Sequence, residues 1–302
     1  MSHIFIHILV LVALPPLLLG VIGKTKALVA GRIGAPFLQP YYDLAKLFRK
    51  GSVFSTTTTW VFRAGPVAGL TTALLAGMLI PMGGHGAPVA FSGDLILFAY
   101  LFALGRFFTA AAALDTGSAF EGMGSAREVT FSCLAEPALF FGFLVLAKLS
   151  ASLSLTTMLD GTFPLGAGVT APSLVLVAAS LFIVLLVENS RIPFDDPNTH
   201  LELTMIHEVM VLDHSGPALG MILYGAAIKL LVLGAVLLRV VAPFATVNPW
   251  TDWALFVAGM LGLAVTIGIV ESVMARFRMV FVPTFLVAAC LLSAFGVILL
   301  VR

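Results

Sequence analysis

The chain has only two cysteines among its 302 residues, and charged residues make up only 10% of it. Cys133 and Cys290 both lie in apolar segments. An iron–sulfur cluster needs four ligands, usually closely spaced, and two isolated thiols are too few to hold one. We expect both cysteines to be small buried hydrophobic residues. The sequence also lacks a Gly-rich phosphate loop, a dinucleotide fingerprint and a basic patch interleaved with aromatics. We therefore expect neither a bound nucleotide cofactor nor nucleic acid.

The chain is instead rich in apolar residues: 60% of its residues are hydrophobic, and its mean hydropathy is +1.10. No soluble domain of this length has that composition. Helices satisfy their own backbone hydrogen bonds in hydrocarbon, so we predict an all-α polytopic membrane protein, with residues 1–302 as one integral membrane domain. Eight apolar runs are long enough to cross a bilayer, at about 4–22, 64–82, 94–114, 129–149, 172–188, 217–239, 251–272 and 279–301.

The connecting loops alternate in charge. Eleven of the sixteen Lys and Arg residues fall in loops 23–63, 115–128, 189–216 and 273–278. Loops 83–93, 150–171 and 240–250 carry none. The positive-inside rule places the first set in the cytoplasm and both termini outside, and an even number of spans agrees with that.

Two of the predicted cytoplasmic loops are long enough to carry short helices. In the first, Pro40 precedes a stretch with Tyr41, Leu44, Ala45 and Phe48 on one helical face, which predicts an amphipathic helix lying in the interface. In the second, Thr199 and Glu202 fit a capping box and predict a helix over about 200–212. Between the third and fourth spans, the glycines of loop 115–128 suggest a tight turn.

Three ionisable residues fall deep within predicted spans: Arg106, Glu136 and Lys229. Ionisable groups are expensive in lipid and usually mark a functional path. The alternative is a structural ion pair that fixes how the helices pack. We favour a proton path through the bundle.

Segment 188–217 holds six of the fifteen acids and three of the six histidines. His200, His207 and His214 are spaced by seven, which on a helix separates them by about 10 Å each. That spacing is too wide for a shared metal, so we expect no metal site. The spacing fits a proton-handling or contact face and a solvated helix equally well.

Two loop motifs carry a family resemblance. The stretch R-I-G-A-P-F-L-Q-P-Y-Y-D-L-A-K-L from Arg32 to Leu47 resembles the R-x-G-P…L-Q-P-x-x-D-x-x-K-L stretch of the H-type (subunit 1) membrane subunit of respiratory complex I. E-N-S-R-I-P-F-D, from Glu188 to Asp195, resembles that family's E-T-x-R-x-P-F-D. Eight helices with both termini outside match its topology, and the resemblance covers essentially the whole chain.

Other stretches resemble the hydrogenase branch of this family, which includes membrane subunits of formate hydrogenlyase and hydrogenase-4. They are D-T-G-S-A-F-E-G-M-G-S-A-R-E from Asp115, the triplet around Glu136, and D-D-P-N-T-H-L-E-L-T-M-I-H-E from Asp195. Glutamates that follow the Pro-Phe-Asp motif in complex I are replaced here by Asn198 and His200, and only Glu202 matches.

The resemblance implies a subunit of a group 4 nickel–iron hydrogenase complex in a bacterial or archaeal cytoplasmic membrane. It implies no cofactor on this chain, with the nickel–iron centre and the iron–sulfur clusters in a large and a small partner subunit on the cytoplasmic side. Antiporter-like membrane subunits are the expected lateral partners, and proton or sodium translocation is the expected coupled process. Candidates for the proton path are Arg106, Glu136, Glu188, Asp195, Glu202, Glu208 and Lys229. Candidates for docking are Arg32, Gln39, Asp43, Lys46, Arg49, Lys50, Arg127, Glu128 and Arg191.

Three other readings remain open. The chain could form the quinone site of a complex I-like oxidoreductase, although the replaced glutamates count against that. A stand-alone secondary transporter often shows broken helices in inverted repeats, and no such paired interruption is visible. A passive anchor fits the composition as well as a coupling subunit does.

Overall fold

The structure is a computed structural model, and it describes residues 2–160, 170–195, 205–243, 246 and 248–301. Helices are the regular elements of this part of the chain, and no strand occurs in it. Eight helices are long and apolar enough to span a membrane: α1 (Ser2–Val29), α3 (Trp60–Leu79), α4 (Asp94–Asp115), α5 (Ala119–Ser150), α7 (Thr170–Glu188), α8 (Gly216–Val241), α9 (Pro249–Val273) and α10 (Val282–Val301). The predicted all-helical, eight-span architecture is confirmed.

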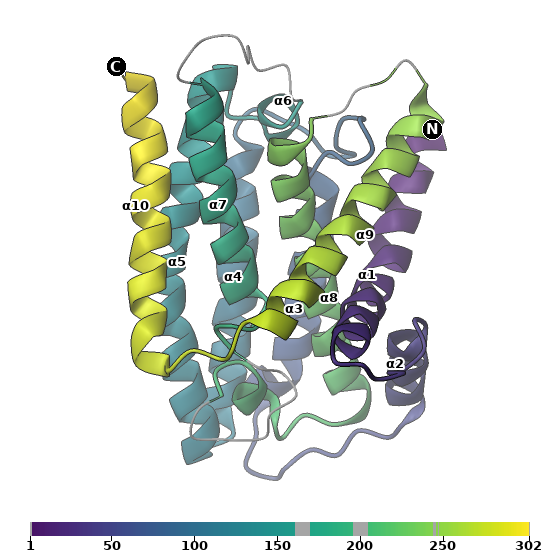
Figure 1. Cartoon of the computed structure of the whole chain (residues 1–302). Coiled ribbons are helices and arrows are strands. Elements are labelled where there is room, and N and C mark those ends of the chain that lie inside the picture. The colour runs from purple at the N-terminus through teal and green to yellow at the C-terminus, as the bar shows by residue number, and fades with distance from the viewer. Residues whose placement is uncertain (1, 161–169, 196–204, 244–245, 247, 302) are drawn as a thin grey trace.

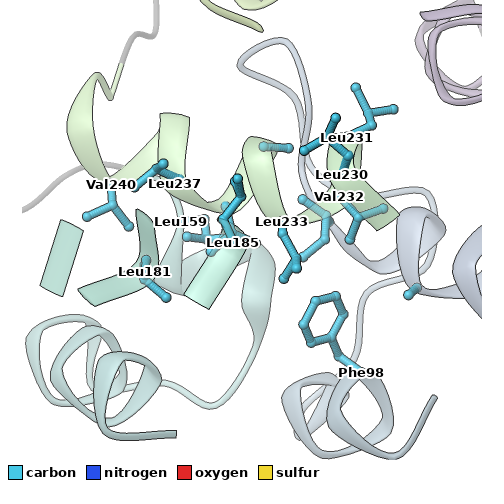
Figure 2. Packing of buried hydrophobic residues seen from close by; sticks show 14 of the residues in the cluster. Phe98, Leu159, Leu181, Leu185, Leu230, Leu231, Val232, Leu233, Leu237 and Val240 are labelled. Carbon is cyan, nitrogen blue, oxygen red and sulfur yellow. The ribbon is translucent and has the colours of Figure 1, made fainter. Parts of the chain in front are cut away.

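Helix α8 lies at the centre of the bundle and contacts α1, α2, α3, α7 and α9. In Figure 1, α10, α5 and α7 stand on one side of it, and the tilted α9 lies with α1 on the other. Its central position follows from its sequence, since residues 230–237 are all apolar and all buried. Figure 2 shows this stretch with Leu181 and Leu185 of α7 and Phe98 of α4. We call residues 230–237 the apolar layer of α8.

Both termini lie at one end of the bundle, and the short helix α2 (Gln39–Arg49) lies at the other (Figure 1). We refer to them as the termini end and the α2 end. At the termini end, the buried carboxylate of Asp94 accepts hydrogen bonds from Leu155 N (2.6 Å) and Ser154 Oγ (3.1 Å). Arg239, only 1% exposed, donates from Nε to Leu159 O at 2.9 Å. These contacts hold the one-turn helix α6 (Leu155–Met158) against the start of α4 and the end of α8.

The orientation of these ends can be tested by cysteine labelling. We expect an impermeant maleimide added to intact cells to label Ser92→Cys, near the termini end, and to leave Lys46→Cys on α2 unlabelled. Both side chains are exposed, and the background would carry Ala in place of Cys133 and Cys290. Inside-out vesicles should reverse the pattern, because the positive-inside rule predicts that the Lys- and Arg-rich loops lie in the cytoplasm. Labelling of Lys46→Cys in intact cells would show that the orientation is the opposite of the predicted one.

Helix α2 forms where the first long loop predicted it, but its apolar face is not simply laid in the interface. Tyr41 donates a hydrogen bond to Ala13 O of α1, and Leu47 and Phe48 lie against Gly220 of α8. Pro40 stands at the first turn, where its missing N–H costs nothing. The helix is therefore fixed to the bundle through α1 and α8.

Two loop predictions are wrong in detail. The predicted helix over 200–212 appears, from residue 205 on, as bends and a short 3-10 helix η1 (Glu208–Val211), while residues 200–204 lie outside the described residues. The predicted turn at 115–128 is mostly helix, because α5 begins at Ala119. Glycines at 122 and 124 are tolerated there, and Gly124 allows the backbone of α5 to approach Val209 and Met210 of the η1 segment closely. A second 3-10 turn, η2 (Met279–Phe281), precedes α10.

Of the histidines spaced by seven, His207 and His214 do not share a helix face, and His200 lies outside the described residues. His214 is buried between η1 and α8, and its ring stacks on Phe62 with centroids 3.9 Å apart and planes 10° apart. Burial lowers the pKa of His214 to about 4. Its Nδ1 has no hydrogen-bond partner within the described part of the chain. His214 therefore acts as a packed core residue.

His214 should make stability depend on pH. Its pKa of about 4 in the folded protein lies below the unfolded value of 6.5, so the unfolded chain binds the extra proton between these values. Stability is then complete above about pH 6.5 and falls as the pH drops toward 4. We expect the melting temperature in mild detergent to fall by several degrees from pH 7 to pH 5. His214→Phe, which keeps the stack, should flatten this dependence, and an unchanged slope would contradict the assignment.

Candidate functional site

The three ionisable residues predicted to lie deep in the membrane form one cluster. Arg106 of α4 pairs with Glu136 of α5 and, through Nη2, with Glu188 Oε1 at the end of α7, 2.8 Å away. Its Nε lies 4.0 Å from Glu128 of α5. Lys229 of α8 contacts Glu188 Oε2 at 2.6 Å. Four helices thus converge on five charged side chains, which we call the central cluster.

The central cluster lies near the middle of the membrane-spanning region. Arg106 is about 18 Å from Asp94 and about 14 Å from Asp115 along α4, at 1.5 Å per residue. Lys229 is similarly far from both ends of α8. The predicted span 172–188 ends at Glu188, which suggests a position at the membrane surface, yet α7 ends inside the bundle and the chain turns there with Ser190 at φ +50°. An apolar run that stops at Glu188 looks the same in the sequence whether it stops inside or outside.

The charges of the central cluster do not balance. Two cations, Arg106 and Lys229, face three carboxylates, Glu128, Glu136 and Glu188, so the formal charge is −1 when all are ionised. A medium of low dielectric disfavours uncompensated charge. One bound proton makes the cluster neutral, so the cluster is suited to hold and release one proton.

Glu136 opens onto the side of the bundle. Its side chain is 43% exposed even though it lies at hydrocarbon depth. It lines a groove of about 400 Å³ between α4 and α5, with the exposed Tyr100 and Phe140 beside it. We call this the lateral groove. A half-exposed carboxylate at this depth needs cover by another protein surface, because lipid tails offer it no hydrogen bonds.

A second space of about 400 Å³ lies beneath α2 and is called the α2 cavity. Its polar lining includes an ion-pair chain in which Glu271 of α9 contacts Lys26 of α1 at 2.8 Å and Arg191 at 3.4 Å. Asp43 of α2 and Glu208 of η1 also line it. Neither Lys26 nor Glu271 was a predicted site residue. Each stands at a helix end, where a charge is normally read as a topology anchor, so only their meeting in space reveals them.

A third, smaller space of about 100 Å³ lies between the other two and is called the inner cavity. It is lined by four members of the central cluster, Arg106, Glu128, Glu188 and Lys229. It shares Arg106 and Glu188 with the lateral groove, and Asn189 and Ser190 with the α2 cavity. The three spaces are therefore neighbours, arranged in a series from the α2 end to the side of the bundle at mid-depth.

Asp195, another proton-path candidate, is 1% exposed and holds its loop together. Arg276 Nη2 donates to Asp195 Oδ1 at 2.8 Å, and Asp195 Oδ2 accepts from the backbone N–H of Ile206 (3.0 Å) and His207 (3.2 Å). The carboxylate thus ties the segment before α8 to the loop after α9. Glu202 lies outside the described residues.

The docking candidates divide into two groups. Arg32, Lys46, Arg49 and Lys50 are exposed at the α2 end, and Gln39 Nε2 donates to Asp43 Oδ1 at 2.9 Å along the same helix. Arg127, Glu128 and Arg191 turn inward instead. Arg127 donates to Met205 O at 2.8 Å, Glu128 belongs to the central cluster, and Arg191 lines the α2 cavity. The described residues contain no group of His, Cys, Asp and Glu side chains suited to a metal ion.

The chain is similar to known proteins along nearly its whole length. A family profile described as NADH dehydrogenase matches residues 2–302. Formate hydrogenlyase subunit 4 of Escherichia coli (strain K12) is 34% identical, over 92% of this chain and 91% of its own length. Hydrogenase-4 component C of the same organism is 31% identical, over 89% and 86%. The H-type subunit of NADH-quinone oxidoreductase from Syntrophotalea carbinolica is 28% identical, over 80% and 74%.

Among solved structures, a chain of the membrane-bound sulfane sulfur reductase, an archaeal respiratory membrane complex, superimposes with a TM-score of 0.83. The alignment covers 98% of this chain and 99% of that one, at 21% sequence identity. This match shows that the two chains share a fold.

Proposed function

Because the chain belongs to the NADH dehydrogenase family, as a relative of the H-type membrane subunit of complex I, we propose that it is the membrane anchor and coupling subunit of a nickel–iron hydrogenase complex. The complex would be of the formate hydrogenlyase or hydrogenase-4 type. Two relatives with those names are more than 30% identical over about nine-tenths of this chain. In this proposal the nickel–iron and iron–sulfur chemistry belongs to the partner subunits.

The observation that carries the coupling role is the series of three spaces that begins under α2 and ends at Glu136. In our proposal, the soluble arm docks at the α2 end, and its change in charge or protonation alters the electrostatic field in the α2 cavity. Groups lining the inner cavity respond by binding or losing a proton, because a nearby charge shifts the equilibrium between protonation states. The central cluster is the bistable element, with the formal charge of −1 or, after one proton, of zero.

The lateral groove gives the direction in which coupling leaves this chain. Between the central cluster and the termini end stands the apolar layer of α8, covered by Arg239 and α6. The lateral groove is instead open, with a carboxylate exposed in it. This supports transfer of a proton, or of its electrostatic effect, sideways into a neighbouring antiporter-like membrane subunit. A proton or a sodium ion would then cross the membrane in that neighbour.

Purification in mild detergent through a tag on this chain tests the proposal. We expect copurification of a nickel-containing large subunit, a small iron–sulfur subunit and antiporter-like membrane subunits, with hydrogen evolution from reduced methyl viologen. Membranes from untagged cells provide the control. A complex that contains flavin and NADH oxidation activity but no nickel would overturn the hydrogenase assignment.

One observation favours a second candidate, the quinone site of a complex I-like oxidoreductase. The α2 cavity, at about 400 Å³, falls within the size range of small-molecule sites, and one relative is named for quinone reduction. The same purification separates the two: quinone retained in stoichiometric amount, together with a missing nickel signal, favours the quinone site.

The docking surface gives a further prediction. Lys46→Glu with Arg49→Glu should release the soluble arm from the membrane, because charge complementarity guides such contacts and both side chains are exposed on α2. The membrane helices should still insert, since neither side chain faces the bundle. The measurement is the fraction of hydrogenase activity that stays with membranes at moderate salt.

A matched control is Arg278→Glu, which reverses an exposed charge in the loop before α10 at the same end. It should leave the arm attached. If the double reversal on α2 also leaves the arm fully attached, α2 is not the dock.

A further inference from the structure

Five residues form the neck between the α2 cavity and the inner cavity, since each of them lines both spaces: Asn189, Ser190, His207, Ile222 and Ala226. Among these five, only His207 has an ionisable side chain, and its two ring nitrogens can accept a proton on one side and donate one on the other. The other side chains are an amide, a hydroxyl and two hydrocarbons. A proton moving between the two spaces past these five residues therefore meets one ionisable side chain, His207.

We propose that His207 is the proton-transfer residue at the neck between the α2 cavity and the inner cavity. This rests on the proposed coupling function and adds to it a residue outside the acidic path candidates. In the step, one ring nitrogen accepts a proton from water in the α2 cavity, and the other ring nitrogen releases a proton toward the central cluster. The imidazole returns to its neutral form, and no other bond is made or broken.

The position of His207 is fixed from both sides. Its backbone N–H and that of Ile206 donate to Asp195, which is itself held by Arg276. On the other side, Arg127 of α5 holds Met205 O. Asp195 and Arg127 are thus positioning residues, whose contacts keep the imidazole at the neck. The ring itself is half-buried.

Unpartnered polar atoms mark a hydrated route through the same spaces. Within the described part of the chain, Arg191 Nε in the α2 cavity, Asn189 Oδ1 at the neck and Arg106 Nε in the inner cavity are buried without hydrogen-bond partners. Buried polar atoms of this kind are normally bound by water. Spaces of about 400 and 100 Å³ exceed the roughly 30 Å³ that one water occupies in the liquid. The neck joins two spaces that are suited to water.

The charges on the two sides of the neck also suit such a step. Toward the α2 end, the charged lining of the cavity is Lys26, Asp43, Arg191, Glu208 and Glu271. Toward the interior, the charged lining is Arg106, Glu128, Glu188 and Lys229, whose formal sum is zero before Glu136 of the lateral groove is counted. With Glu136 the central cluster carries −1. The net negative charge of the central cluster therefore favours transfer of a proton from an imidazolium at the neck toward that cluster.

The test uses the assembled complex in sealed vesicles with a trapped pH dye and reduced methyl viologen as electron donor. We expect His207→Gln and His207→Ala to cut proton movement per hydrogen formed by at least about tenfold, since a positioned acid–base group typically contributes roughly 100-fold or more. Hydrogen formation itself should be unchanged, since the partner subunits carry it. Added imidazole should restore movement in His207→Ala, because the removed ring leaves space in the cavity, and should leave His207→Gln unrestored.

His214→Phe is the matched control, since it removes the histidine seven residues further on that packs against Phe62 away from the neck. It should keep wild-type proton movement. Wild-type movement in both His207 variants, or assembled His207→Ala that imidazole fails to restore, overturns the assignment of His207. Loss of movement in Glu136→Gln alongside intact His207 variants would overturn this inference alone. Absence of movement in the wild type would overturn the coupling function as well.

Discussion

Arg106→Met is expected to destabilise the protein more than any other single change in the membrane-spanning region. Removing the guanidinium leaves Glu128, Glu136 and Glu188 facing one another with Lys229 as the single remaining cation of the central cluster. Breaking a buried ion pair by removing one partner costs about 3–5 kcal/mol. That is a large part of the 5–15 kcal/mol or so that ordinary folded proteins possess. The measurements are the amount of chain in the membrane and its melting temperature in mild detergent.

A compensated variant distinguishes charge from packing. Arg106→Met combined with Glu128→Gln and Glu136→Gln leaves the Lys229–Glu188 pair, with its 2.6 Å contact, as a neutral unit. We expect this triple variant to regain most of the lost stability and to remain uncoupled. If it melts as low as Arg106→Met alone, the loss comes from the shape of the arginine side chain. A wild-type melting temperature in Arg106→Met would contradict the cluster itself.

Glu136→Gln is expected to do the opposite, with little effect on stability and a large effect on coupling. Glu136 is half-exposed, and Arg106 keeps its contact with Glu188 when the charge at 136 is removed. Glutamine is a near-isostere that cannot bind and release a proton. We therefore expect intact assembly and intact dye-linked hydrogen oxidation, because the soluble arm performs that chemistry. Ion movement per turnover should fall more than about tenfold, as for other positioned proton-transfer groups.

Parallel assays on wild-type and variant vesicles decide the point. Arg278→Gln, which removes an exposed charge in the loop before α10, serves as a control for a general effect of charge on transport. Unchanged ion movement in Glu136→Gln, with unchanged assembly, would make Glu136 a structural partner of Arg106. The lateral groove would then have no support as an exit from the bundle.

Much of the architecture could be predicted from the apolar runs and loop motifs of the sequence. Apolar runs of bilayer length located all eight spans, and two loop motifs placed the chain in its family, which the relatives confirm. The depth of Arg106, Glu136 and Lys229 was also readable, since their distances from the ends of an apolar run follow from the rise per residue. The contacts of Arg106 with three acids could not be predicted, because one sequence does not show how each helix is rotated or which helices pack together.

The wrong loop predictions have a common physical cause: packing against the bundle changes the backbone conformation that a short polar segment adopts. Glycines and charges at 115–128 are typical of a turn, yet packing against the η1 segment keeps residues from Ala119 onward helical. Asp195 accepts hydrogen bonds from Ile206, His207 and Arg276, so it fixes its loop, and its place in a proton path stays a prediction. Equal spacing suggested one helix face for His207 and His214, and the bends at 206–207 and the 3-10 turn after them break that face.

The apolar layer of α8 has a consequence for voltage. Lys229 and Arg239 are ten residues apart, so about 15 Å of close-packed hydrocarbon separates them. Water in the α2 cavity and the inner cavity would extend the electrical potential of the α2 side into the bundle. Most of the membrane potential would then fall across the apolar layer of α8. A charge that enters from the α2 end and stops at Glu188 crosses little of the field. The work of roughly 2.3 kcal/mol per elementary charge per 100 mV must then be done beyond the lateral groove, outside this chain.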